Sequence, residues 1–250
     1  MSPEPIPVRA SSMLECRNCG AGAPLDEHFC PQCSRILALG RHGDYFSFLG
    51  VPRKLALDGA DLERRFRDLS RKFHPDYFYN ASATERLASL ERSSYLNDAF
   101  RALRHPVSRI EHLLAIEGLP SARSEEGTAK VPPSLLEEVF ALNEELDEIR
   151  ELRESGAAPE TLRARLEKAR APIETKRAEH ERQLQELSAR WDAQDTAMAA
   201  DRHATLEALR ERLLERNYIN NLLATIEREG SGLEAPGSGH GNPEAMGPKP

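Results

Sequence analysis

Helical periodicity from Asp44 to about Glu229 is the feature that most constrains what this chain can fold into. Apolar residues recur at helical spacing through most of this stretch, and its second half is rich in Glu, Leu, Arg and Ala. Charged residues make up 30% of the 250 residues and aromatic residues only 6%. This balance favours small helical domains over one large packed core. The sequence therefore predicts an all-α fold.

Changes in composition divide the chain into six segments. Stretches rich in Pro, Gly or Ser separate the patterned regions, and a tail with almost no apolar residues is expected to be disordered. The predicted segments are a flexible lead over 1–15, a four-cysteine unit over 16–40, a helical domain over 43–118, a linker over 119–133, a helical bundle over 134–229 and a tail over 230–250.

Composition also limits the classes of partner. The net charge is −7, and a mildly acidic chain is a poor general binder of nucleic acid. No apolar run approaches the ~18 residues that a membrane helix needs, and the first residues do not have the pattern of a secretion signal. We expect a cytoplasmic protein with neither a membrane nor a nucleic-acid partner.

All four cysteines lie between positions 16 and 33, in two Cys-x-x-Cys pairs. Cys16 and Cys19 form the first pair, and Cys30 and Cys33 form the second. Four thiolates complete a tetrahedral zinc site and leave no position for water, so we expect a structural zinc ribbon. His28 is expected at the surface. An iron–sulfur centre or two redox-active dithiols would use the same cysteines, and both alternatives stay open.

Capping residues divide the middle domain into four helices. Asp44 and Asp58 are suited to cap the first two, and Ser82 with Glu85 has the capping-box spacing of a third. The second helix must end near His74, because proline disfavours helix in the residue before it. The predicted helices run over Tyr45–Leu49, from Asp58 to about His74, from Ser82 to about Arg104, and over Val107–Glu117.

A basic stripe on the second of these helices leads to a His-Pro-Asp turn. The stripe lies opposite the apolar face of the helix, with a lysine to one side. Its members are Arg64, Arg67 and Arg71, with Lys72 beside them, and the turn is His74-Pro75-Asp76. Such a stripe is either a solvated charged face or a docking surface for an acidic partner, with the turn at its end.

The first helix of the C-terminal bundle carries an apolar stripe and two apolar residues outside it. The stripe consists of Leu135, Val139, Leu142, Leu146 and Ile149. Leu136 and Phe140 lie roughly a quarter-turn or more off the stripe. They either widen the core face or form an exposed recognition patch. Further along, Pro172 is expected to kink or divide its helix.

The basic helix, the His-Pro-Asp turn and the long helix after it resemble J-domains, the co-chaperones of seventy-kilodalton heat-shock ATPases. Further motifs are similar to HscB, the J-protein family dedicated to iron–sulfur cluster assembly, some members of which carry an N-terminal four-cysteine zinc module. These motifs are Tyr45-Phe46-x-x-Leu49-Gly50-Val51-Pro52, Phe73-His74-Pro75-Asp76, Leu96-Asn97-x-Ala99-Phe100 and Leu142–Ile149. The resemblance covers about residues 43–229 and departs from the family at Tyr77, where a basic residue is usual.

The resemblance implies a protein that acts by binding and is not an enzyme. It implies a J-domain followed by a three-helix bundle, with an HscA- or DnaK-type ATPase chaperone docking on the basic stripe and the turn. It further implies that an IscU-like cluster scaffold binds the bundle. The implied scaffold-binding residues are Leu136, Phe140, Glu144, Glu148 and Tyr218, of which the three apolar ones are expected to be substantially exposed and close together. A general J-protein for unfolded clients and a zinc- or thiol-based redox-sensing interaction protein remain alternatives.

Overall fold

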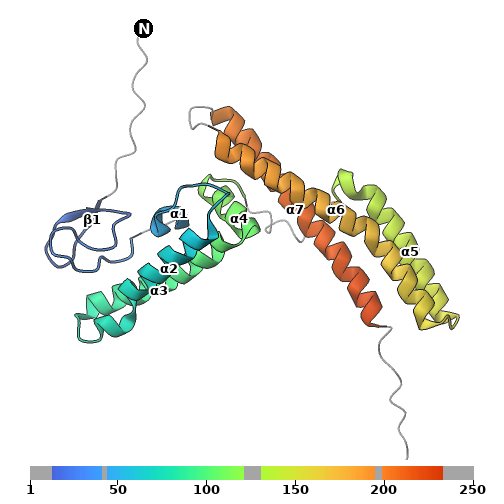
Figure 1. Cartoon of the computed structure of the whole chain (residues 1–250), viewed down its shortest axis with the longest axis horizontal. Helices are drawn as coiled ribbons and strands as arrows, with labels where there is room; N and C mark the ends of the chain where they lie inside the picture. The colour runs from blue at the N-terminus through green and yellow to red at the C-terminus, as the bar shows by residue number, and fades with distance from the viewer. Residues whose placement is uncertain (1–12, 41–43, 121–130, 195–198, 233–250) are drawn as a thin grey trace, which may run out of the picture. The chain divides into compact units, whose positions relative to one another are not determined.

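The protein is described from a computed structural model, which covers residues 13–40, 44–120, 131–194 and 199–232. Most of the predicted lead, linker and tail lies outside these ranges. Within them the fold is all-α, apart from two short strands near the start (Figure 1). None of the described helices is both long and apolar enough to cross a membrane. The predicted fold class is therefore confirmed.

A two-stranded antiparallel sheet begins the four-cysteine ribbon. β1 (Met13–Glu15) pairs with β2 (Gly22–Pro24), with Leu14 opposite Ala23. The strand β1 occupies positions that the sequence assigns to the flexible lead, so the ribbon begins earlier than predicted. The buried core of the ribbon consists of Cys16, Ala23, Cys30 and Leu37. Such a small core needs a further cross-link to hold a fold.

Four helices and a 3₁₀ turn follow, close to the predicted bounds. They are α1 (Tyr45–Leu49), α2 (Gly59–Phe73), η1 (Pro75–Phe78), α3 (Ala83–Arg104) and α4 (Pro106–Ile116). The side chains of Asp44 and Asp58 cap α1 and α2, and Ser82 with Glu85 forms the capping box of α3. The helix α4 begins one residue earlier than predicted, because proline is well suited to the first helical position.

The core of this middle domain lies where α3 packs against α1 and α2. Leu62 and Phe73, from the apolar face of α2, are almost completely buried. Phe66 stacks on Phe100 of α3 with ring centroids 4.2 Å apart, an arrangement that aromatic rings favour. This packing fixes the end of α2, and with it the start of the His-Pro-Asp turn, against α3.

Three helices preceded by a 3₁₀ turn form the C-terminal bundle (Figure 1). They are η3 (Pro133–Leu135), α5 (Leu136–Glu154), α6 (Pro159–Ala193) and α7 (Ala199–Ser231). All five residues of the predicted apolar stripe are buried, and they pack with apolar residues of α6 and α7. The predicted three-helix bundle is therefore confirmed.

The sequence predicts that Pro172 kinks or divides its helix, and the structure shows that it does not divide α6. The helix is continuous from Pro159 to Ala193. Ile173 is almost completely buried in the bundle core, and Ala169 packs against the same core. Burial of these neighbours offsets the backbone hydrogen bond that proline removes from a helix.

The described chain forms two compact units. One comprises the described residues of Met1–Glu126 and Gln185–Glu211, and the other those of Gly127–Leu184 and Arg212–Pro250. The sequence predicts a single unit over 134–229, whereas residues 185–211 group with the middle domain. Two contacts within the first unit explain the difference. The Asp192 carboxylate accepts hydrogen bonds from the amides of Leu55 and Ala56 at 2.7 Å each, and Arg210 donates to the Pro120 carbonyl.

Candidate functional sites

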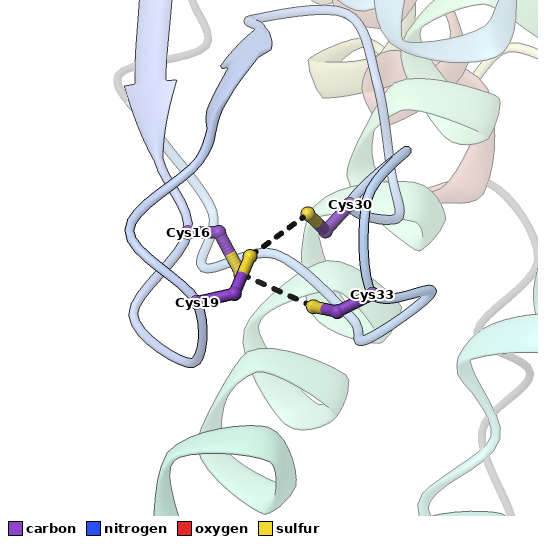
Figure 2. Close-up of side chains that lie close together, drawn as sticks. All are labelled: Cys16, Cys19, Cys30 and Cys33. Atoms are coloured by element: carbon purple, nitrogen blue, oxygen red, sulfur yellow. Dashed lines mark hydrogen bonds between the residues drawn. The ribbon is translucent and has the colours of Figure 1, made fainter.

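The four cysteines converge from two loops of the same construction (Figure 2). In each loop the carbonyl of the first cysteine accepts a 2.8 Å hydrogen bond from the amide four residues later, Gly20 to Cys16 and Ser34 to Cys30. Gly20 and Ser34 both have left-handed backbone, with φ of 72° and 57°. These two equivalent bends direct the thiols of each pair toward those of the other.

The sulfur atoms are close enough to share one metal ion. The Sγ atoms of Cys16 and Cys33 are 3.6 Å apart, those of Cys19 and Cys30 are 3.7 Å apart, and all four lie within 4.8 Å of one another. Zn–S bonds of about 2.3 Å place the sulfurs of a tetrahedral site roughly 3.8 Å apart. A cluster of several iron atoms would spread the cysteines further. The spacing therefore fits a single ion.

The ionisation of the thiols also suits a cation. The backbone amide of Arg35 and the side chain of Asn18 lower the pKa of Cys33 to about 6. The backbone amide of Ala21 lowers the pKa of the exposed Cys19, but desolvation and the three neighbouring thiols raise it to about 12. Like charges that share a site oppose each other's ionisation. A divalent cation removes this opposition when it binds thiolates, so the four residues fit a metal ion.

The ribbon is seated on the middle domain. Nη1 of Arg35 donates to both carboxylate oxygens of Glu85 at 2.8 Å. The half-buried His28 ring packs edge-on against Phe48 and Phe73, with centroid distances of 4.8 and 4.9 Å. The prediction of a surface position for His28 is therefore wrong, because its packing partners come from a separate segment of the sequence.

The His-Pro-Asp turn has a fixed base and an exposed tip. At the base, the Phe73 carbonyl accepts hydrogen bonds from the hydroxyls of Ser89 and Ser93 at 2.6 and 3.0 Å. His74 has φ −55° and ψ 126°, the extended backbone that precedes a proline, and its Nδ1 accepts from the Asp76 amide at 3.3 Å. The side chain of Asp76 is 87% exposed. The turn thus presents a carboxylate in a defined direction.

The basic stripe of α2 is exposed but paired along its own helix. Each arginine contacts a carboxylate three or four residues earlier: Arg64 with Asp61, Arg67 with Glu63, and Arg71 with Asp68. The three arginine side chains remain more than half exposed, and Lys72 beside them is exposed as well. Surface pairs of this kind contribute little to stability. The arginines can therefore exchange these partners for carboxylates of another protein.

Four apolar side chains near the turn and at the start of α3 are exposed, and of these only Tyr77 is singled out from the sequence. Tyr77, Tyr79, Leu87 and Leu90 are each more than half exposed. The Tyr77 ring lies 6.1 Å from the His74 ring. Helical phase could have identified Leu87 and Leu90, because they fall off the buried face of α3. The four side chains add exposed apolar surface after the turn and at the start of α3.

The predicted scaffold-binding residues differ in exposure. Leu136 is 40% exposed and Phe140 is 69% exposed, so neither widens the bundle core. Tyr218 is half-buried and packs against that core. The expectation that Tyr218 is substantially exposed is therefore wrong, because its ring covers core residues. Of the two carboxylates, Glu144 is exposed and Glu148 forms an ion pair with Arg165 of α6.

Comparison with known proteins links these features to one family. No protein-family model matches the chain. The chain is 41% identical over 106 residues to the "Co-chaperone protein HscB homolog" of Vibrio parahaemolyticus serotype O3:K6 (strain RIMD 2210633). That alignment covers 42% of this chain and 61% of the relative, so the match spans about three fifths of the relative's length.

Solved structures agree in fold. The crystal structure of human co-chaperone protein HscB matches with a TM-score of 0.58 and 27% identity, covering 86% of this chain and 98% of that one. Chaperone HscB from Vibrio cholerae matches with a TM-score of 0.56 and 26% identity, covering 76% and 99%. The resemblance of this chain to the HscB co-chaperones, in sequence and in fold, is therefore confirmed.

Proposed function

We propose that this protein is a J-protein co-chaperone, which delivers an IscU-like cluster scaffold to an HscA- or DnaK-type ATPase chaperone and stimulates ATP hydrolysis by that chaperone. The observation that carries the proposal is the His74-Pro75-Asp76 turn. It is exposed at the end of a basic helix and anchored on α3, in a chain that resembles the HscB co-chaperones.

The turn and the basic stripe have different roles in this proposal. The stripe attracts an acidic surface of the chaperone, which speeds the encounter and sets its orientation. Asp76 then pairs with a basic group of the chaperone. His74 and Pro75 hold the backbone of the turn, so that little conformational freedom is lost when the carboxylate is engaged.

The exposed pair on α5 supplies the scaffold-binding surface. Leu136 and Phe140 are the large apolar side chains that the described part of the bundle exposes. A holder of many unfolded clients needs a broad apolar surface, whereas one compact pair suits a single folded partner. In this proposal Glu144 and Glu148 form a polar rim beside the pair, and Tyr218, which is half-buried against the bundle core, completes the binding surface.

We propose zinc as the metal of the ribbon, bound by Cys16, Cys19, Cys30 and Cys33. A tetrahedral site with four thiolates is closed to substrate, so the ion acts as a structural cross-link. Metal analysis should give about one zinc ion per chain. Metal-free protein with all four cysteines in disulfides would contradict the assignment and favour the redox-sensing alternative.

The function is tested by measuring ATP hydrolysis of an HscA-type chaperone with and without this protein and a cluster scaffold. Wild-type protein should raise the rate, and His74→Gln should abolish that effect while still binding the scaffold. His105→Gln is the matched control, because His105 also precedes a proline, is exposed and makes no side-chain cap hydrogen bond. A chaperone rate that wild-type protein leaves unchanged, with scaffold present, would refute the proposal.

A further inference from the structure

Arg92 of α3 is completely buried, at 0% exposure. Its guanidinium donates through Nε to the Leu37 carbonyl at 2.8 Å, and through Nη2 to the carbonyls of Ala38 at 3.2 Å and Glu27 at 3.4 Å. All three acceptors belong to the four-cysteine ribbon. The helix of one domain thus inserts a cation among the backbone carbonyls of another.

His28 extends this network to α1. Nη1 of Arg92 lies 2.7 Å from Nδ1 of His28. Arginine can only donate, so Nδ1 is the acceptor and the ring carries its proton on Nε2. Nε2 then donates to the Phe48 carbonyl at 3.1 Å. One continuous chain of hydrogen bonds therefore runs from α3 through the ribbon to α1.

The same network touches the residue before the His-Pro-Asp turn. The Arg92 guanidinium lies 5.8 Å from the ring centroid of Phe73, and the His28 ring packs edge-on against the Phe73 ring with a centroid distance of 4.9 Å. The Phe73 carbonyl is held by Ser89 and Ser93, which lie within three residues of Arg92 on α3. One segment of α3 thus contacts both the side chain and the backbone carbonyl of Phe73. His28 of the ribbon supplies a further packing contact to the Phe73 ring.

We infer that Arg92 is a positioning residue, which locks the metal ribbon onto the J-domain and, through Phe73, makes the geometry of the His-Pro-Asp turn depend on whether the ribbon holds its metal. Burial lowers the pKa of Arg92 to about 10, so the group is still a cation at neutral pH. A buried cation needs its acceptors, and the ribbon supplies them only while its two loops are folded around the thiols. The consequence for ATPase stimulation rests on the proposed function.

Thermodynamic linkage makes this coupling reciprocal. If metal binding keeps the acceptors of Arg92 in place, substitution of Arg92 must lower the affinity of the ribbon for its metal ion. Substitution leaves three carbonyls and Nδ1 of His28 facing a neutral side chain, and each lost hydrogen bond to a charged group favours opening of the ribbon.

The first measurement is the rate at which zinc passes from the full-length protein to an excess of a colorimetric chelator. Arg92→Gln should release zinc about tenfold faster or more, and Arg92→Lys should recover part of the difference because it keeps the charge. Arg101→Gln is the matched control, because Arg101 lies on the same helix and is 75% exposed. Equal release from Arg92→Gln and Arg101→Gln would overturn the inference.

The second measurement is hydrogen exchange of the segment 70–79, which contains the last turn of α2 and the His-Pro-Asp turn. Stripping zinc from wild-type protein should speed exchange in this segment, Arg92→Gln should do the same with zinc bound, and the two changes should not add. Unchanged exchange after zinc removal would refute the coupling, even where Arg92→Gln fails to fold. Neither measurement includes a chaperone, so both results stand independently of the ATPase assay.

Discussion

Truncation of Phe140 to alanine tests whether this side chain binds a partner or stabilises the bundle core. The side chain is 69% exposed, so folding removes about a third of its roughly 200 Å² from water, which corresponds to at most about 1.5 kcal/mol of the free energy of unfolding. The same change at Leu142, which is 3% exposed on the same helix, should cost about 2–5 kcal/mol. For a chain of this size, each kcal/mol shifts Tm by roughly 2–4 °C.

Thermal unfolding and scaffold binding are therefore measured on both variants. Phe140→Ala should melt within about 6 °C of wild type and lose about tenfold or more of its affinity for an IscU-like scaffold, as expected for an aromatic anchor. Leu142→Ala should melt well below both, with its residual folded fraction binding normally. A large drop in the Tm of Phe140→Ala would place this ring in the core. Near-normal stability together with unchanged scaffold affinity would remove the patch from the binding surface.

Three further predictions concern the basic stripe, the ribbon and the bundle. Arg71→Glu should weaken docking to the ATPase chaperone, more at low salt than at high salt, because exposed charges are screened; a loss that does not depend on salt would argue against steering. Ser34→Gly should slow zinc release about two- to fivefold, because a left-handed backbone strains serine and not glycine; release as fast as from wild type would show that the bend is unstrained. Burial lowers the pKa of His180 below its usual 6.5, so the unfolded state binds more protons just below that pH. The contribution of His180 to the free energy of unfolding should therefore be fully present above about pH 6.5 and be lost as the pH falls toward the folded-state pKa. A Tm that does not decline between about pH 7 and 5 would contradict this.

The bounds of the helices in the middle domain could be predicted from the sequence, because the interactions that begin these helices are local. The caps at Asp44 and Asp58 and the capping box at Ser82 work through side chains that bond amides two or three residues away, so a short window of sequence contains the whole interaction. The apolar stripe of α5 follows for the same reason, since helical phase alone decides which residues face the core.

Non-local contacts account for what the sequence did not predict. The role of Arg92 depends on acceptors 54 to 65 positions away in the chain. Helical phase places Arg92 on the buried face of α3, but it does not identify these acceptors. His28 belongs to this group, because its partners Phe48 and Phe73 become neighbours only in the folded protein. The exposure that the family resemblance implies for Tyr218 is also wrong, because its ring packs against the bundle core.

Glu85 makes stabilising contacts in both the ribbon and the middle domain, although the sequence composition separates these two segments. The sequence assigns Glu85 a local task, the reciprocal capping of α3, and the structure confirms it. The same carboxylate also accepts from Arg35 of the ribbon, and this hydrogen bond is the largest of the contacts that lower the pKa of Glu85. One side chain therefore stabilises the start of α3 and holds the ribbon on that helix. The clustered cysteines mark the ribbon as a separate segment of the sequence. Contacts of Glu85, His28 and Arg92 nevertheless connect the ribbon to the middle domain.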